Sequence, residues 1–155
     1  MATYDTQRPY IASYVIIKNE DGHIGFVLRS NTTWMNDHYG LPSGKIENNE
    51  TFTAGAQREL KEEVGLDVPI ENIKQVFVMH RYSANDKTPD TSQWVDVYFE
   101  VSDYEGEPYN AEPDIHSEFA WLDPDNLPDN IIPDTRAALE AYSQGKSYFE
   151  WGFDD

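Results

Sequence analysis

The stretch from residue 44 to residue 66 constrains the fold of this chain most, because it joins a helical apolar pattern to a run of acids. On a helix, at about 100° per residue, three apolar residues fall in one stripe that must face a core: Ala56, Leu60 and Val64. Glu59 and Glu63 lie one turn apart on the flank of that stripe. The pattern therefore predicts a helix that carries carboxylates at the border of its buried face.

The residues alone leave two explanations open for these acids. A run of glutamates is most often a solvated helix face, and Arg58 can pair with Glu62 four positions further on. A carboxylate beside a buried stripe, however, is costly unless another group compensates its charge. Clustered carboxylate oxygens suit a hard cation such as Mg²⁺, with Mn²⁺ as an alternative. The spacing favours a metal site without establishing one.

The same stretch resembles the signature of the Nudix hydrolases. That signature reads Gly, five residues, Glu, seven residues, then Arg-Glu-apolar-x-Glu-Glu-x-Gly-apolar. All nine specified positions are filled here, by Gly44, Glu50, Arg58, Glu59, Leu60, Glu62, Glu63, Gly65 and Leu66. Nine matches within 23 residues are far more than chance provides, so the chain is identified as a member of this family.

The resemblance implies a role for the acidic residues and the arginine. Glu59, Glu62 and Glu63 would bind one or more Mg²⁺ ions, aided by the backbone carbonyl of Ser43. Arg58 would orient the glutamate beside it. A carboxylate that binds no metal, either Glu59 or an acid from another loop, would act as the base on the attacking water.

Other positions in and beside the signature carry expectations as well. Gly44 would let the backbone turn closely around the metal, and Gly65 would end the helix in the left-handed conformation. Glu50 would either take part in catalysis or interact with the positive end of the helix dipole. Many relatives read Pro-Gly-Gly where this chain has Ser43 in the middle position. Serine would be mildly unfavourable there if the position required a positive φ.

Beyond the signature, the resemblance extends weakly to the MutT-like branch, which hydrolyses nucleoside triphosphates. By position, Arg29 would bind phosphate, Glu112 would add a carboxylate to the metal site, and Asn130 would contact the base. Their plainer alternatives are a surface arginine, a solvated loop acid and a turn residue. Tyr82 lies where hydrolases of dinucleoside polyphosphates tend to carry a tyrosine. Both Tyr82 and Trp34 could stack on a base or sugar.

The rest of the chain reads as alternating strands and helices. Apolar segments at 11–18 and 24–28, joined by Asn-Glu-Asp-Gly, predict a β-hairpin. The other predicted elements are strands at 74–80, 94–101 and 118–122 and helices at 51–64 and 133–143. Together with the resemblance, this order implies an α/β (α+β) fold, a Nudix-type α/β/α sandwich with a mixed β-sheet between helices. We expect one domain over residues 1–155.

Charge and composition argue against several classes of protein. The chain has 11 basic and 29 acidic residues, a formal net charge of −18, which disfavours binding to nucleic acid or to an anionic membrane. It has no cysteine, and no apolar run approaches the roughly 20 residues of a membrane span. Its first residues show no signal-peptide pattern, so a cytoplasmic protein is expected. A homodimer remains open, because many relatives dimerise.

One expected function and two alternatives follow. The first is a Mg²⁺-dependent pyrophosphohydrolase that converts a nucleoside triphosphate, including an oxidised one such as 8-oxo-dGTP, to the monophosphate and pyrophosphate. The second acts on another compound with a nucleoside diphosphate, such as a dinucleoside polyphosphate, ADP-ribose or a nucleotide sugar. The third, from another class, is a catalytically silent module that binds a nucleotide. Retention of every signature acid counts against this last reading.

Overall fold

The computed structural model describes residue 6, residues 8–83 and residues 93–153. In this part of the chain the strands are β1 (Tyr10–Ile17), β2 (Ile24–Arg29), β3 (Tyr39–Gly40), β4 (Ser43–Lys45), β5 (Lys74–Tyr82), β6 (Gln93–Val101), β7 (His116–Leu122) and β8 (Tyr148–Trp151). The helices are α1 (Phe52–Val64), the short 3-10 helix η1 (Ile70–Asn72) and α2 (Pro133–Ser143).

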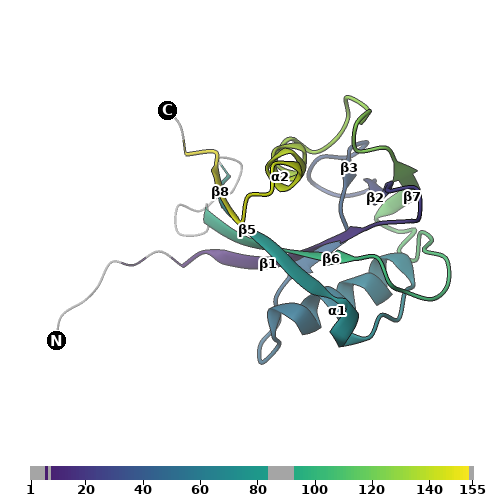
Figure 1. Ribbon diagram of the computed structural model, residues 1–155. Coiled ribbons are helices and arrows are strands. Elements are labelled where there is room, and N and C mark those ends of the chain that lie inside the picture. Colours follow the sequence, from purple (N-terminus) through teal and green to yellow (C-terminus); the bar gives the residue numbers. More distant parts are fainter. Residues whose placement is uncertain (1–5, 7, 84–92, 154–155) are drawn as a thin grey trace.

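The strands form two sheets, and the larger one lies between the two α-helices. The larger sheet has the order β4-β1-β6-β5-β8, and the smaller one has the order β3-β2-β7. Strand β1 is parallel to β6, and β5 is parallel to β8, whereas the other neighbouring pairs are antiparallel. Helix α1 contacts β1 and β4, while α2 contacts β5 and β8, so the helices lie on opposite sides of the larger sheet (Figure 1). The predicted α/β/α sandwich is confirmed, with two sheets in place of one.

The near-continuous apolar run of β1 reflects burial on both of its faces. Val15 and Ile17 belong to the core cluster on the α1 side, whereas Ile16 between them belongs to the cluster on the α2 side. Strand β6 divides in the same way, with Phe99 on the α1 side and Tyr98 on the α2 side. Because successive side chains of a strand point to opposite faces, a sheet covered on both sides needs apolar residues at every position.

The predicted hairpin is half right. The turn between β1 and β2 forms, with Gly22 N–H donating to Asn19 and an isolated antiparallel bridge between Lys18 and Ile24. Beyond that bridge the strands separate, since β1 belongs to the larger sheet and β2 to the smaller one. Both edges of β1 are already paired, with β4 and with β6, and this leaves no edge for β2.

Helix α1 begins and ends where local sequence signals place its boundaries. Thr51 is the N-cap and accepts a hydrogen bond from the Ala54 N–H at 3.1 Å. Gly65 ends the helix in the left-handed conformation at φ 71°, as expected. The predicted stripe of Ala56, Leu60 and Val64 is fully buried.

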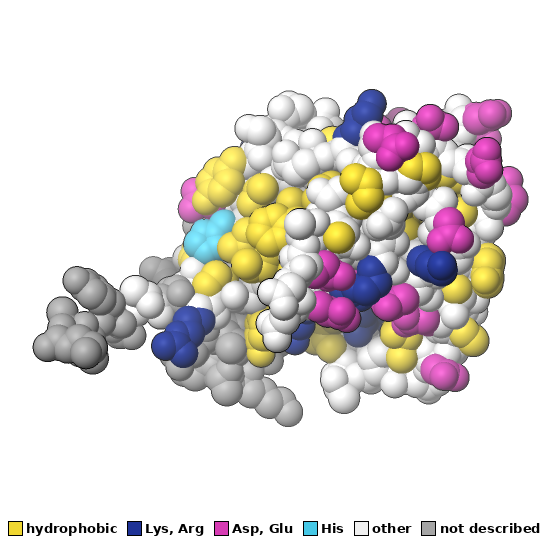
Figure 2. Space-filling model, turned by 90° about the horizontal axis from the view of Figure 1, so that it is seen from below, with side chains coloured by type: hydrophobic (Ala, Val, Ile, Leu, Met, Phe, Trp, Pro, Cys, Tyr) yellow, Lys and Arg dark blue, Asp and Glu magenta, His cyan; other side chains and the backbone are white. Residues whose placement is uncertain are grey.

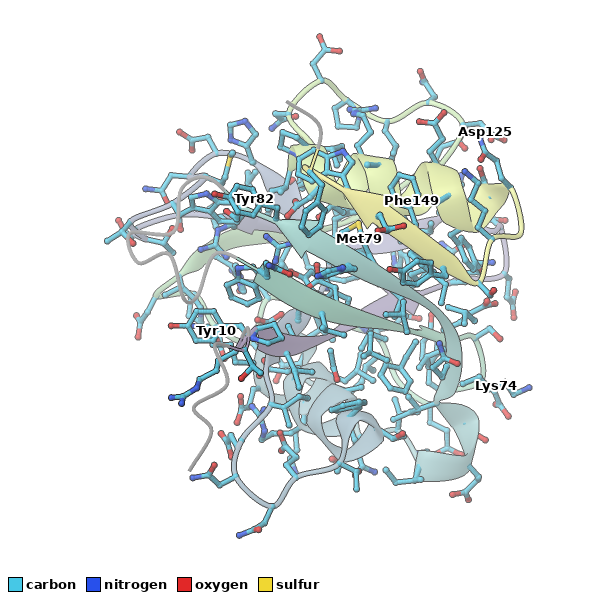
Figure 3. The ribbon with its side chains drawn as sticks, turned by 90° about the vertical axis from the view of Figure 1, so that its left-hand side faces the viewer. Tyr10, Lys74, Met79, Tyr82, Asp125 and Phe149 are labelled. Carbon is cyan, nitrogen blue, oxygen red and sulfur yellow. The ribbon has the colours of Figure 1, made fainter. Side chains whose placement is uncertain are left out.

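The C-terminal segment adds an edge strand that the sequence pattern did not reveal. Strand β8 runs parallel to β5 and places Phe149 beside Met79 (Figure 3). Phe149 and Trp151 both pack against the core cluster on the α2 side. These two aromatic residues thus dock on the body of the protein, whereas Tyr148 is exposed. Among the described helices, neither length nor apolar character suffices to cross a membrane.

Candidate active site

A cavity of about 550 Å³ lies where both sheets and both helices meet. Its wall includes residues from β1, β2, β4, β5, β6 and β7, together with the C-terminal end of α1 and the start of α2. Its wall includes four residues for which the sequence predicts a role in metal or phosphate binding: Arg29, Ser43, Gly44 and Glu63. The cavity therefore connects the acidic helix to the rest of the fold.

Glu63 faces this cavity from the last turn of α1. One of its oxygens accepts a hydrogen bond from the backbone N–H of Ser43 at 3.0 Å. Burial raises the pKa of Glu63 well above its usual value, and the negative charges of Glu59 and Glu112 raise it further, while Arg29 opposes them. Ser43 lies in β4 and has no positive φ, so serine is not strained in the place of the glycine of many relatives.

Glu59 lies one turn earlier on α1 and is also buried. Burial raises its pKa to about 7; Arg58 lowers it, and the charges of Glu62 and Glu112 add to the increase. Arg58 Nη1 donates to the Glu59 carboxylate at 2.6 Å. A carboxyl group with such a pKa is partly deprotonated at neutral pH, which suits a proton acceptor.

Arg58 connects several acids of the signature. Its Nε donates to Glu50 at 2.7 Å and its Nη2 to the other Glu50 oxygen at 3.0 Å, which forms a bidentate pair. Its Nη1 also reaches Glu62 at 3.2 Å, which confirms the predicted pairing four residues apart. Glu50 additionally accepts from the backbone N–H of Glu47 at 3.1 Å. Glu50 thus holds Arg58 in place, and a catalytic or helix-dipole role of Glu50 stays a prediction.

The loop that carries Glu112 is attached to the end of α1. The backbone N–H of Tyr109 donates to Val64 at 3.1 Å, and that of Ala111 donates to Glu63 at 3.0 Å. Burial raises the pKa of Glu112, and Glu62 raises it further. The expected additional carboxylate therefore lies close enough to interact with the acids of the helix.

These acids fit a divalent cation by their chemistry. The charge of Glu112 raises the pKa of both Glu59 and Glu63, and Glu59 raises that of Glu63 as well. Only oxygen atoms are offered there, as Mg²⁺ or Mn²⁺ prefers. In the described part of the chain no three acidic or histidine side chains converge as ready metal ligands. Arg58 instead holds the carboxylates of Glu59 and Glu62. The metal roles of these residues, and of the Ser43 carbonyl, stay predictions.

Arg29 lines the same cavity at the end of β2. Its Nε donates to the carbonyl of Trp34 at 3.0 Å and its Nη2 to Thr32 Oγ1 at 3.3 Å. Its guanidinium also lies 5.3 Å from the centre of the Trp34 ring, and Trp34 lines the cavity too. The loop after β2 therefore orients the predicted phosphate-binding arginine towards the cavity that Glu63 faces.

Two predicted substrate-binding residues lie elsewhere. Asn130 is outside the described cavity wall, and its side-chain amide donates to the carbonyl of Asp37 at 2.8 Å. Tyr82 lies at the end of β5 (Figure 3) and is exposed. Its ring centre lies 5.8 Å from that of Phe153. Asn130 positions the loop of residue 37, and Tyr82 contacts the C-terminal segment. Any contact of either residue with substrate remains a prediction.

Sequence reasoning missed a buried ion-pair network on the other side of the cavity. Arg81 Nε donates to Asp96 at 2.7 Å, and its Nη1 lies 3.2 Å from a carboxylate oxygen of Asp134. Arg81 and Asp134 line the cavity beside Trp94, whose ring lies 4.7 Å from the Arg81 guanidinium. The available signal was Asp96, one of two acids in a strand that is otherwise mostly apolar. Its partner Arg81 lies in the neighbouring strand β5, and the sequence alone does not reveal that the two residues pair.

The fold is a mixed α/β sandwich, and the acidic end of helix α1 is buried beside a cavity that basic side chains line. This combination defines a class of small hydrolases that cleave phosphorus-containing acid anhydrides. Comparison with known proteins supports this class. Residues 8–142 match the NUDIX domain. The chain belongs to the Nudix family and is a hydrolase of pyrophosphate bonds.

Solved structures of MutT-like proteins share the fold. A MutT Nudix hydrolase from Burkholderia pseudomallei is 28% identical, with a TM-score of 0.75 over 86% of this chain and 98% of that one. A MutT protein from Methanosarcina mazei Go1 is 18% identical, with a TM-score of 0.71 over 92% of this chain and 97% of that one. The ORF135 protein of E. coli is also 18% identical, with a TM-score of 0.71 over 92% and 94%. The chain is therefore similar to the MutT-like branch of the family.

Proposed function

We propose that this chain is a Mg²⁺-dependent pyrophosphohydrolase of nucleoside triphosphates, including oxidised ones such as 8-oxo-dGTP, and that it releases a monophosphate and pyrophosphate. One observation carries the proposal. Three basic side chains, Arg29, Lys45 and Arg81, line the described cavity of a chain that has only 11 basic residues against 29 acids. Asp96 and Asp134 balance the charge of Arg81, so Arg29 and Lys45 supply the positive charge that suits a polyanionic small molecule.

The residues of the site divide into three groups in this proposal. Glu62, Glu63 and Glu112, with the Ser43 carbonyl, would hold Mg²⁺, and Mn²⁺ could replace it; Glu59 would be a further ligand only if another acid served as the base. When bound, the cation would offset negative charge on the phosphate oxygens and lower the pKa of bound water. Arg29 binds a phosphate oxygen from the other side of the cavity.

Glu59 is the proposed base. Arg58 orients its carboxylate through the 2.6 Å hydrogen bond and is itself held by Glu50. With a pKa of about 7, Glu59 can accept the proton of the attacking water near neutral pH. The proton leaves that water while its oxygen attacks phosphorus, and the bond to the bridging oxygen breaks.

Several broader features belong to the same proposal. All of residues 1–155 would form one catalytic domain that acts on a small molecule in the cytoplasm and not on nucleic acid. The silent-module alternative finds no support in the site, because its signature acids are present and Arg58 orders three of them. Sedimentation of the purified protein would decide between a monomer and a homodimer.

Replacement of Glu63 tests the assigned site. Glu63→Gln should lower kcat on the order of a thousandfold or more, because transition-state stabilisation at the metal is lost. The fold should persist, since burial already favours the uncharged form of this side chain. Glu140→Gln, an exposed position on α2, is the matched control and should behave as the wild type. Near-normal turnover of the Glu63 variant would refute the metal role.

A substrate screen tests the choice of substrate. Nucleoside triphosphates, dinucleoside polyphosphates, ADP-ribose and nucleotide sugars should be offered with Mg²⁺, and the products identified by mass. Release of a monophosphate and pyrophosphate from a triphosphate, abolished by EDTA, is the expected result. Efficient turnover of ADP-ribose alone would overturn the triphosphate proposal, and absence of any EDTA-sensitive hydrolysis would favour the silent module.

A further inference from the structure

His116 is a cavity residue to which neither the signature nor the proposed function assigns a role. It is the first residue of β7, it lines the cavity, and it is 2% exposed. In the pairing of β2 with β7 its Cα partner is Arg29. The register shifts between Leu28 and Arg29, but both side chains line the cavity and the charge of Arg29 acts on the imidazole, so the two groups are neighbours there.

The backbone of His116 is held by two hydrogen bonds, whereas the ring nitrogen Nδ1 has no partner among the described residues. Its N–H donates to the carbonyl of Glu112 at 3.0 Å, and its own carbonyl accepts from the side chain of Asn110 at 2.8 Å. Within the described residues, Nδ1 is the buried side-chain polar atom that has no hydrogen-bond partner. Buried polar groups are nearly always paired, so an orphan at a cavity wall points to a partner that the protein itself does not supply.

The ring is also uncharged in the folded protein. Burial lowers the pKa of His116 to about 4, and the positive charge of Arg29 lowers it further. A neutral imidazole can still donate one hydrogen bond. Beside Arg29, an uncharged donor avoids placing two cations next to each other, yet it can bind the same anion.

We propose that His116 is a substrate-binding residue that donates a hydrogen bond from Nδ1 to a non-bridging oxygen of the diphosphate group bound by Arg29. The inference rests on the proposed function only in that the substrate carries a diphosphate. The Nδ1 atom, which has no hydrogen-bond partner among the described residues, gains one when the substrate binds.

Two substitutions separate this role from a purely structural one. The amide nitrogen of Asn can occupy the place of the histidine Nδ1 and donate in the same way, whereas Leu fills the space without a donor. If His116 were only a core residue, Leu would be the better replacement, because it removes an unsatisfied polar group. If His116 binds substrate, His116→Asn should have the higher affinity for substrate, whereas His116→Leu should be the more stable of the two variants.

The first experiment measures kcat, KM and Tm for both variants with the best substrate from the screen. His116→Leu should raise KM about 10-fold or more, as expected for loss of a hydrogen bond to a charged group, with kcat within about 3-fold and Tm at or above that of the wild type. His116→Asn should keep KM within about 3-fold even if its Tm falls. Any other pattern, including a wild-type KM in His116→Leu or KM values that follow Tm, overturns the inference.

A binding experiment distinguishes failure of this inference from failure of the proposed function. Protein with ¹⁵N-labelled histidine is titrated with imidodiphosphate and Mg²⁺, and the His116 ring signals are assigned by their loss in His116→Leu. A shift of these signals, with those of His23 in the distant turn unchanged, supports the contact even if no triphosphate is hydrolysed. Unchanged His116 signals overturn the contact even if the enzyme is active.

Discussion

At the scale of single residues, the site depends on contacts so close that one added carbon atom would disturb them. A Cβ at position 44 would overlap the carboxylate of Glu59. Gly44 lies in β4, and its φ is not positive, so a side chain is excluded by space and not by backbone conformation. From the sequence we expect the backbone at Gly44 to turn closely around the metal. In the structure, the group that lies against Gly44 is the carboxylate of Glu59, the proposed base.

Gly44→Ala should inactivate the enzyme without unfolding it. The added methyl group pushes the Glu59 carboxylate from its place beside Arg58, and misplacement of a catalytic group by about 1 Å can cost on the order of 100-fold in rate. We expect kcat to fall by at least this factor, measured with the best triphosphate, while circular dichroism stays that of the wild type.

Ser43→Ala is the matched control for this substitution. Ser43 contacts Glu63 through its backbone N–H, which alanine retains. Its kcat should stay within about 3-fold of the wild type. Wild-type turnover by Gly44→Ala, or an equal loss in both variants, would contradict the assignment of the Gly44 contact.

Residue by residue, the sequence could predict the groups of the signature but not their partners from other elements. Arg58 and Glu62 are four apart on one helix, so their pairing follows from helical geometry. The link between Arg81 and Asp134 joins β5 to α2, and that pair is known only once the chain is folded. His116 reaches the cavity for the same reason, through the pairing of β7 with β2.

At the scale of elements, the junction between α1 and the loop before β7 sets the position of Glu112. Gly65 ends α1 in the left-handed conformation, and a Cβ there would overlap the ring of Tyr109. The backbone bonds from Tyr109 and Ala111 fasten the loop to the same helix end. Gly65 thus both terminates the helix and accommodates the docked loop.

Removal of the Tyr109 ring should loosen this junction. Tyr109→Ala should raise the Mg²⁺ concentration for half-maximal activity about 10-fold, since residues that orient metal ligands typically affect affinity at this level. Binding of Mn²⁺, followed by electron paramagnetic resonance, should weaken in parallel.

Tyr109→Phe keeps the ring in place against Gly65 and should bind both metals as the wild type does. Equal metal dependence of the Ala variant and the wild type would show that the backbone bonds alone position Glu112.

Elements with local signals could be predicted, and elements defined by distant partners could not. Both α-helices carry an apolar stripe and recognisable ends, and α2 occupies the predicted range of 133–143. Strands β3, β4 and β8 have two to four residues, too few to show a period of two. The turn of the predicted hairpin forms, but the pairing of its strands does not continue, because the second edge of β1 is taken by β6, which lies about 80 residues further along the chain.

At the scale of the whole molecule, the anionic substrate must approach a strongly acidic protein. The net charge is −18, and the surface seen from the α1 side shows many acidic side chains (Figure 2). The basic residues Arg29 and Lys45 line the cavity and act only at short range, whereas Asp96 and Asp134 balance the charge of Arg81 there. Repulsion at long range therefore opposes encounter, while attraction at contact favours binding.

This division of charge predicts an unusual response to salt. The screening length falls from about 30 Å at 0.01 M to about 10 Å at 0.1 M, so added salt removes the distant repulsion and weakens contacts within the cavity much less. Over that range kcat/KM for a triphosphate, measured at constant Mg²⁺, should rise about 2-fold or more. Neutralising exposed acids of the loop before α2 with Asp123→Asn and Asp125→Asn should reduce this rise without altering kcat. A decrease of kcat/KM with salt would instead mean that the cavity cations already dominate the encounter, and that the acidic surface has no part in the rate.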